Sequence, residues 1–586
     1  FQAWENPVAS MKGREEGTKE NQMLANFFGE LDLTKDLVFK SSLGIESNNS
    51  ANSSFVDPYR TGSGRAYRGI GTNATNIDFT WLNENTLTYS ASFKEGHRFT
   101  ALAGFTVQQF EWDGTNQEVR NFVGDAIPTL NAGAVSVTNT TDATEWTMAS
   151  LIGRVTYDYQ GKYLLTANIR RDASSRFGKE NRWGTFPSVS AGWRISDENF
   201  MAGLRHLVND MKLRVSWGMN GNQPEDPYAA YGKVSPSGGY PFGDVLLPGV
   251  TQTRASNDSL KWETTRQLNA GIDLSLYDSR IQLSADVYYK KTKDLLMDVS
   301  VATQMGQANQ LRNVGNVDNK GFELSISSKN LTGDLKWNTN LNFSLNRNKV
   351  KNLGGEEVLL FSGNIYERGD VSIVREGEPI GSFYGLIATG VDPQTGMMTY
   401  EDQNTDGKYD DADRVIIGNA QPKFIFGLNN TFSYKSLSLG FLFQGVQGND
   451  IFNASRIEIE GMENWKNQST EVLRRWKTPG DVTDIPKALA DNKDNSLLST
   501  RFLEDGSFIR LKSVTVSWNL KSAWLESMQI SKVQLYFTGQ NLWTITDYSG
   551  YDPELNFGGT SNTALGIDFG TFPQPRTFIF GVNVDF

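Results

Sequence analysis

The sequence of 586 residues has no cysteine, only two histidines and no long apolar run. The absence of cysteine excludes disulfide scaffolds, thiolate metal sites and cysteine nucleophiles. His97 and His206 are too few for a histidine-rich metal site and allow at most one Ser-His-Asp triad. No stretch reaches the roughly 18 apolar residues that a transmembrane helix requires, so a helical membrane protein is excluded. A membrane protein that crosses the bilayer with β-strands is not excluded.

Basic residues are also in the minority. Lys and Arg number 56 against 67 Asp and Glu, which gives a net charge of −11. No basic tract interrupts this acidic balance. Nucleic-acid binding requires clustered Lys and Arg to meet phosphates, so we expect no nucleic-acid partner.

The strongest positive signal is the alternation of apolar and polar residues with a period of two. From Trp337 to Asn346 one face is apolar or aromatic and the other consists of Asn and Ser. This pattern predicts strands, and pairs of such segments joined by short turns predict antiparallel hairpins. The clearest pairs are Phe424–Tyr434 with Leu437–Gln444, and Leu268–Leu276 with Ile281–Tyr289. Turns are expected at Lys435–Ser436 and Asp278–Ser279, and the whole chain is expected to hold roughly fourteen to sixteen strands.

Alternation alone fits either soluble β-sandwiches or a barrel in lipid. Three features favour the barrel. The polar faces carry few charges, whereas water-facing sheets usually carry Lys and Glu. The apolar faces are rich in Phe, Leu, Tyr and Trp, as in a lipid-facing band with aromatic girdles. The chain ends on an alternating segment, Thr577–Phe586. We therefore predict an all-β fold, a large antiparallel transmembrane β-barrel that spans residues 1–586.

Long polar stretches without a steady period lie between the predicted hairpins. They predict long loops at the end of the barrel opposite the short turns. A short loop helix is expected at Glu471–Lys477, where Val472, Leu473 and Trp476 have helical spacing. The predicted loops are Asn48–Asn76, Thr115–Glu145, Gly221–Leu260, Asn352–Thr399 and Gly448–Phe502.

One segment has the spacing of a calcium-binding loop. Residues 402–413 place oxygen-bearing side chains at positions 1, 3, 5, 9 and 12 of a twelve-residue loop, with Gly407 at the sharp turn. Ca²⁺ takes six to eight oxygen ligands, and this spacing can fold them around one point. The predicted ligands are Asp402, Asn404, Asp406, the carbonyl of Lys408, Asp410 and Asp413. Asp413 stands where a bidentate Glu is usual, and a bare acidic turn is the alternative. We expect structural Ca²⁺.

Catalytic signals are weak. His97 follows a Lys-Glu-Gly sequence and is expected in a turn, and His206 is expected to be a packing or surface residue. Neither lies in a nucleophile motif, so we predict no enzyme activity. Trp112, Trp465 and Trp543 are candidates for stacking on sugar rings, but such residues more often pack loops or form girdles.

Several segments resemble the SusC-like branch of TonB-dependent outer-membrane transporters. The matching segments run in order from about Tyr157 to Phe586. They include Tyr157–Leu165, Arg171–Gly178, Asn181–Ser188, Leu213–Gly218, Leu260–Thr265, Asn313–Glu323, Pro379–Gly385, Asp413–Gly418, Phe508–Lys512, Gly539–Trp543 and Tyr548–Glu554.

The resemblance implies a 22-stranded barrel around an N-terminal plug, energised through TonB. It also implies a SusD-like lipoprotein over the outer mouth, and glycan or peptide as substrate. The sequence departs from that pattern because it shows no plug domain and no TonB-binding box. We therefore expect the C-terminal barrel portion of a longer receptor.

The leading functional hypothesis is nutrient import across a Gram-negative outer membrane. Its partners would be outer-membrane lipid, a SusD-like lipoprotein, and TonB through a plug outside this sequence. A passive porin-like channel is the alternative, followed by an outer-membrane enzyme or a soluble carbohydrate-binding β-protein.

Overall fold

The computed structural model describes residues 5–94, 96–300, 309–354, 360–365, 367–464, 466–491, 493–520 and 529–585. The chain divides into two compact units. Unit 1 comprises residues 1–191, 218–265 and 294–314, and unit 2 comprises residues 192–217, 266–293 and 315–586. In the described ranges no helix is both long and apolar enough to span a membrane.

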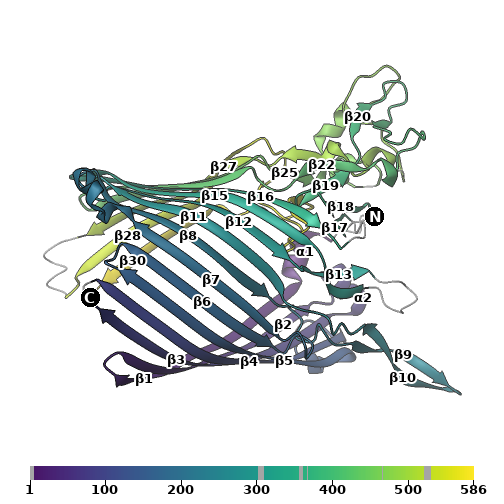
Figure 1. The fold of residues 1–586 in the computed structure, drawn as a ribbon. Helices are drawn as coiled ribbons and strands as arrows, with labels where there is room; N and C mark the ends of the chain where they lie inside the picture. Colours follow the sequence, from purple (N-terminus) through teal and green to yellow (C-terminus); the bar gives the residue numbers. More distant parts are fainter. Residues whose placement is uncertain are drawn as a thin grey trace. The chain divides into compact units, whose positions relative to one another are not determined.

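Unit 1 is dominated by long strands that follow one another as an antiparallel meander. Figure 1 shows β3, β4, β5 and β6 side by side. The elements of this unit are α1 (Pro7–Lys12), β1 (Arg14–Thr34), β2 (Leu37–Val56), α2 (Gly62–Tyr67), β3 (Ile70–Phe93), β4 (His97–Phe122), η1 (Leu130–Ala132), β5 (Gly133–Tyr159), β6 (Tyr163–Ser174), β9 (Lys233–Phe242), β10 (Val245–Arg254), β13 (Leu296–Ser300) and β14 (Asn309–Asn313). Three further strands, β7 (Trp183–Arg194), β8 (Val208–Asn222) and β11 (Glu263–Leu276), are divided between the units.

Unit 2 continues with shorter strands and with an additional layer formed by its long connections. Its strands are β12 (Ile281–Lys293), β15 (Asn316–Thr332), β16 (Leu335–Asn352), β17 (Leu360–Ile365), β18 (Gly369–Val374), β19 (Ser382–Gly385), β20 (Ala388–Val391), β21 (Met398–Tyr400), β22 (Val415–Asn419), β23 (Phe424–Tyr434), β24 (Leu437–Gln447), β25 (Asp450–Asn453), β26 (Leu503–Asp505), β27 (Phe508–Leu520), β28 (Lys532–Thr546), β29 (Ile567–Asp568) and β30 (Thr577–Asp585). Its helices are α3 (Ser455–Glu460) and the 3₁₀ turns η2 (Ile195–Asp197), η3 (Asn199–Leu204), η5 (Asp411–Asp413), η6 (Thr470–Arg474), η7 (Asp494–Ser496) and η8 (Thr500–Phe502).

The strands predicted from alternation are confirmed, and their register aligns the apolar faces. Leu341 on β16 is paired with Leu428 on β23, which is paired with Phe443 on β24. Polar residues align on the opposite face, where Asn342 is paired with Gly427. Over the described residues the large antiparallel sheet has 17 strands, slightly more than the sequence predicted. The turns at Lys435–Ser436 and Asp278–Ser279 are also confirmed.

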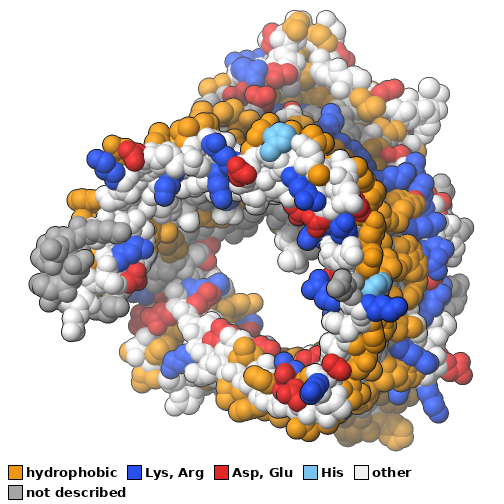
Figure 2. All heavy atoms as spheres, turned by 60° about the vertical axis from the view of Figure 1, so that its left-hand side comes forward, with side chains coloured by type: hydrophobic (Ala, Val, Ile, Leu, Met, Phe, Trp, Pro, Cys, Tyr) orange, Lys and Arg blue, Asp and Glu red, His pale blue; other side chains and the backbone are white. Residues whose placement is uncertain are grey.

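The apolar face carries an aromatic row at its short-turn end. In unit 1, Phe93 pairs with His97, His97 with Tyr159, and Tyr159 with Tyr163. The rings of His97 and Tyr159 lie 4.4 Å apart between centroids. Figure 2 shows hydrophobic side chains gathered in a band on the right of the view, with Lys, Arg, Asp and Glu side chains bordering it. Amphipathic rings bordering an apolar area are typical of a girdle at a membrane interface.

Two of the predicted loops are largely wrong. Strand β2 runs to Val56 and β3 starts at Ile70, so most of Asn48–Asn76 is strand. Likewise β4 runs to Phe122 and β5 starts at Gly133, inside Thr115–Glu145. Both faces of these strand ends are polar, so the alternation that marks a strand fades although the ladder of backbone hydrogen bonds continues. The predicted helix Glu471–Lys477 is a 3₁₀ turn, Thr470–Arg474.

The other three predicted loops contain local structure. Residues 221–260 hold the β9–β10 hairpin, residues 352–399 hold β17 to β21, and residues 448–502 hold β25, α3 and 3₁₀ turns. In unit 2 these connections share one core with the segment that follows β28. Phe383, Phe452, Phe502 and Ile567 are fully buried there. The long connections of this unit therefore form a packed layer (Figure 1) rather than separate loops.

Candidate functional site

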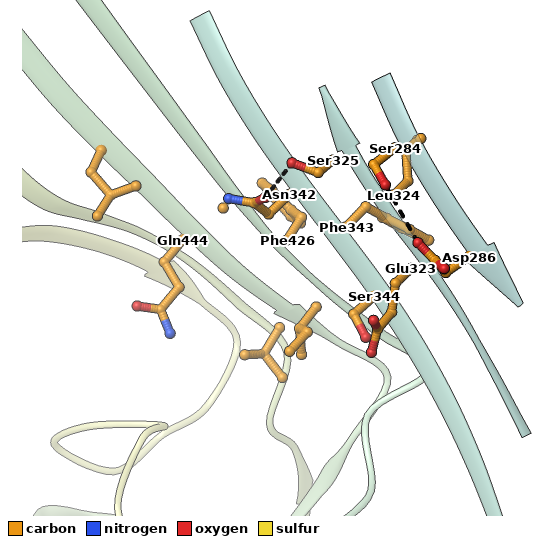
Figure 3. A pocket seen from close by; sticks show the side chains of 14 residues that line it. Ser284, Asp286, Glu323, Leu324, Ser325, Asn342, Phe343, Ser344, Phe426 and Gln444 are labelled. Carbon is orange, nitrogen blue, oxygen red and sulfur yellow. Dashed lines mark hydrogen bonds between the residues drawn. The ribbon is translucent and has the colours of Figure 1, made fainter. Parts of the chain in front are cut away.

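The polar face of the unit 2 strands carries a row of groups that form hydrogen bonds. Ser284, Ser325, Asn342 and Gln444 follow one another across neighbouring strands. They line a cavity of about 560 Å³, together with apolar side chains that include Ile425, Leu442 and Val446. Ser325 Oγ donates to Asn342 Oδ1 at 3.0 Å (Figure 3). Hydroxyl and amide groups offer both donors and acceptors, so this wall suits a hydrated or polar solute.

Two carboxylates beside this row share one arginine. Arg214 on β8 lies 2.8 Å from Asp273 of β11 and 3.0 Å from Asp286 of β12, all within unit 2. Ser284 Oγ also donates to Asp273 at 2.9 Å. In the described structure the neighbouring Glu323 carboxylate forms no hydrogen bond or ion pair, and Figure 3 shows it beside Ser344 at the cavity wall. The wall therefore combines a fixed cluster of paired charges with one free carboxylate.

A second cluster ties the segment after β28 to the polar face. Arg510 on β27 is 3% exposed and donates to Asp552 at 2.5 Å, and it also pairs with Glu554. Lys512 and Gln444 each lie 3.1 Å from Glu554. Burial alone would raise the pKa of Asp552, but the hydrogen bonds from Arg510 and two backbone N–H groups lower it overall. Asp552 therefore stays ionised, and we call this group the Arg510 clamp.

The same segment is also fixed on its other side. Tyr548 Oη donates to Asp568 at 2.6 Å. Glu504 accepts hydrogen bonds from both the backbone N–H and the hydroxyl of Ser549, each at 2.8 Å. Burial and the hydrogen bond to Asp568 raise the pKa of Tyr548. Because each of these groups is satisfied internally, residues 547–568 are held as part of the packed layer.

In the predicted calcium loop, the first three ligand side chains fold around one turn. Asp402 accepts hydrogen bonds from the N–H groups of Asp406 at 3.2 Å and Gly407 at 2.8 Å. Asn404 Oδ1 accepts from the Asp406 N–H at 3.0 Å. Gly407 has a φ of +80°, which fits the sharp turn expected there. Each of these oxygens keeps a second lone pair, so the donor chemistry suits a hard cation.

The end of the loop is arranged differently. Asp413 is fully buried and accepts from the N–H groups of Gln403 at 2.8 Å and Asp410 at 3.1 Å. The hydrogen bond from Asp410 is the main cause that lowers the pKa of Asp413. Asp410 itself accepts from Ala412 N–H at 2.8 Å. No cluster of three or more His, Cys, Asp or Glu side chains suited to a metal occurs among the residues that the structure describes. Calcium binding therefore stays a prediction.

The remaining single residues have structural positions. His97 begins β4 rather than lying in a turn, and its Nδ1 is 2.7 Å from Tyr157 Oη. His206 lies in an exposed turn before β8, as expected. Trp543 is 57% exposed and lies on the apolar side of β28 with Ile545, which fits a girdle better than a sugar platform. Trp112 lies on β4 and packs against Gly114, and Trp465 falls outside the described residues.

The sequence analysis did not single out the two charge clusters. A usable signal was present, because Asp273 and Asp286 each lie between uncharged residues on the polar faces of their strands. Asp552 and Glu554 lie in one of the segments quoted for the family resemblance. Which cation meets which carboxylate depends on strand register and loop folding, and neither follows from alternation.

Comparison with known proteins gives a consistent result. Residues 6–542 match the family model described as "TonB dependent receptor-like, beta-barrel". The chain is 35% identical to TonB-dependent receptor P3 of Formosa agariphila, covering 99% of this chain and 60% of that protein. It is 28% identical to TonB-dependent receptor SusC of Bacteroides thetaiotaomicron, covering 99% of this chain and 57% of that protein. The chain thus spans about three fifths of the length of these curated relatives.

Solved structures show the same fold. A chain in the structure of the RagAB peptide transporter superimposes with a TM-score of 0.86 at 24% identity. That match covers 98% of this chain and 62% of the other. The likeness shows that the strands adopt the barrel fold of these receptors.

Proposed function

The chain belongs to the TonB-dependent receptor-like β-barrel family and is an outer-membrane β-barrel, and from this premise we propose that it forms the conduit of a nutrient importer. The substrates we propose are oligosaccharides or peptides. The observation that carries the proposal is the row of Ser284, Ser325, Asn342 and Gln444 on one face of the strands. The opposite face of the same strands carries aligned apolar residues. A barrel that is apolar outside and polar inside gives a hydrophilic solute a path through hydrocarbon.

No covalent chemistry is needed for this role. Hydroxyl, amide and carboxylate groups on the wall replace part of the solute's hydration, and their spacing selects among solutes. The paired charges of Arg214, Asp273 and Asp286 hold that wall and leave it one net negative charge. The relatives named above are receptors, and nothing in their names indicates an enzyme.

We further propose two partners, a SusD-like surface lipoprotein and TonB. One solved relative is named the RagAB peptide transporter, and a curated relative is named SusC. The packed layer of unit 2 supports a partner at the outer end, because its shared core gives a fixed surface rather than separate flexible loops. Coupling to TonB would use the part of the receptor that lies outside these residues, since the chain covers only about three fifths of its relatives.

The lipoprotein proposal predicts co-purification. We expect the full-length receptor, extracted from outer membranes in a mild detergent, to retain a lipoprotein of SusD type in near-stoichiometric amount. The measurement is size-exclusion chromatography followed by mass spectrometry of the complex. A receptor that elutes alone after gentle extraction would contradict this partner.

Dependence on TonB separates an importer from a passive pore. We expect cells that lack TonB to lose uptake of the transported nutrient while keeping normal amounts of the receptor. A porin-like channel would continue to pass the nutrient in those cells, and that outcome would favour the alternative.

We also propose structural Ca²⁺ in the loop 402–413. Asp402, Asn404, Asp406 and Asp410 supply side-chain oxygens and Lys408 a carbonyl, while Asp413 closes the loop. When bound, the ion would neutralise the adjacent carboxylates and stiffen the connection between β21 and β22.

The calcium prediction is tested by stability with and without the ion. We expect Ca²⁺ to raise the melting temperature of the unaltered receptor relative to chelator, and Asp406→Ala to abolish that difference. Asp411→Ala, a change at an exposed acidic residue of the same loop outside the ligand pattern, is the control and should keep the response. Equal melting of the unaltered protein in Ca²⁺ and in chelator would leave a bare acidic turn.

A further inference from the structure

A cluster of basic residues lies on the apolar side of three adjacent strands of unit 2. The cluster consists of Lys291 on β12, Lys320 on β15, and Arg347, Lys349 and Lys351 on β16. Strand register places them side by side, because Tyr289 pairs with Lys320 and Lys320 with Arg347. One step further along, Lys291 pairs with Asp318 and Asp318 with Lys349. We call this group the basic cluster.

The basic cluster begins directly beyond the last row of apolar side chains. Val287, Phe322 and Leu345 form that row on the same face of the same strands. The row containing Lys320 is two residues further along, which is about 7 Å of strand. The short turns of these strands lie at their opposite ends, and Figure 1 shows the arrowheads of β12 and β16 pointing away from those turns. In outer-membrane barrels the long connections face outward, so the basic cluster lies at the outer interface.

Most of this positive charge is not neutralised by the protein. Asp318 is the acidic residue within the basic cluster, and it lies 3.9 Å from Lys351 and accepts a hydrogen bond from Tyr289 at 2.8 Å. Among the described residues, Lys291, Lys320, Arg347 and Lys349 have no ion pair. The guanidinium of Arg347 is held in place, since it donates to the carbonyls of Asn346 at 2.8 Å and Pro422 at 3.2 Å. Five cations thus face one buried carboxylate.

We propose that the basic cluster binds the phosphate groups of lipid headgroups in the outer leaflet. Lipid phosphates lie just outside the hydrocarbon layer of the membrane. Lys320 and Arg347 lie at the same level, because they follow directly after the last apolar row, which includes Val287 and Phe322. Basic side chains next to a membrane-spanning segment attract anionic headgroups. A phosphate can accept several charge-assisted hydrogen bonds from lysine and arginine at once. An acidic protein surface is a less suitable occupant, because these residues are on the face that contacts lipid.

Lipid A, the phosphorylated anchor of the outer leaflet, serves as the probe. The full-length receptor in detergent is incubated with diphosphorylated lipid A, and retained lipid is counted by native mass spectrometry. A triple variant, Lys291→Gln, Lys320→Gln and Lys349→Gln, removes three charges of the basic cluster. The matched control, Lys290→Gln, Lys329→Gln and Lys336→Gln, removes three lysines from the polar face of the same strands.

We expect the triple variant to bind lipid A at least tenfold more weakly and the control to bind like the unaltered receptor. Removing both phosphates from lipid A should weaken its binding to the unaltered receptor by a similar factor, a comparison that does not depend on the variant folding. Excess inorganic phosphate should displace little lipid A, because free phosphate lacks the acyl chains. Equal binding of dephosphorylated lipid A would overturn the proposal. So would a triple variant that keeps lipid A but loses the surface lipoprotein, since that result would assign the cluster to a protein partner.

Discussion

Replacing Arg510 with Met is expected to destabilise the folded receptor by about 3–5 kcal/mol, since it leaves two carboxylates beside the polar wall without their main partner. Arg510 is 3% exposed and binds both Asp552 and Glu554. A buried carboxylate that loses its cation must be protonated, or the segment must open to water. We expect residues 547–568 to detach, and hydrogen–deuterium exchange of that segment to rise well before the strands themselves unfold.

Two further variants show whether the paired charge is the cause. Lys512→Met removes the second cation that pairs with Glu554, but Lys512 is one-third exposed. We therefore expect this change to lower the free energy of unfolding by under about 1 kcal/mol. Adding Asp552→Asn and Glu554→Gln to Arg510→Met removes the unpaired charges and should recover much of the lost stability. If exchange in residues 547–568 stays unchanged in Arg510→Met, the clamp does not hold the segment.

Placing an arginine at Leu341 is expected to cost about 2–4 kcal/mol in the free energy of unfolding from lipid bilayers. Leu341 lies midway along the apolar face of β16, between Leu428 of β23 and Ile326 of β15. A guanidinium at that height has no water or counter-ion within reach, so the penalty is near its maximum. Equilibrium unfolding by denaturant in lipid vesicles measures the difference.

The adjacent residue provides the matched control. Asn340 lies on the polar face of the same strand, paired with Ser327 and Asn429. We expect Asn340→Arg to change the free energy of unfolding by less than about 1 kcal/mol, because the guanidinium there can be hydrated. Equal costs for the two substitutions would mean that the two faces meet similar surroundings, which contradicts a lipid-exposed apolar face.

Much of the sheet was predictable from the sequence, because one constraint shapes both the alternation of residues and the pairing of strands. That constraint is the contact of one face of each strand with lipid. The ends of β23 agree with the prediction Phe424–Tyr434, and β12, β16 and β24 begin within two residues of their predicted starts. In each of them one face meets lipid and the other does not, so the residue pattern must alternate with every second side chain. The resemblance of Tyr548–Glu554 and the other segments to the SusC-like branch agreed with the family that the comparisons show.

The prediction from the sequence failed in segments that do not contact lipid. Beyond the lipid both faces of β2 and β5 are polar, so Asn48–Val56 and Gly133–Glu145 look like loops although they are strands. The packed layer of unit 2 was also missed. Its core brings together Phe383, Phe452 and Ile567, which are far apart in the sequence, and each lies in a segment too short to show a period.

The amino-acid sequence by itself determined the fold class, the two faces of each strand and the family, because contact with lipid imposes a repeating choice of side chain at every second position. Only the tertiary structure decided which charges meet. Arg510 reaches Asp552, and Lys320 stands beside Arg347, through strand register and loop folding. Register shifts of two residues preserve the alternation of faces but change every cross-strand partner, so periodicity carries no information about such pairs.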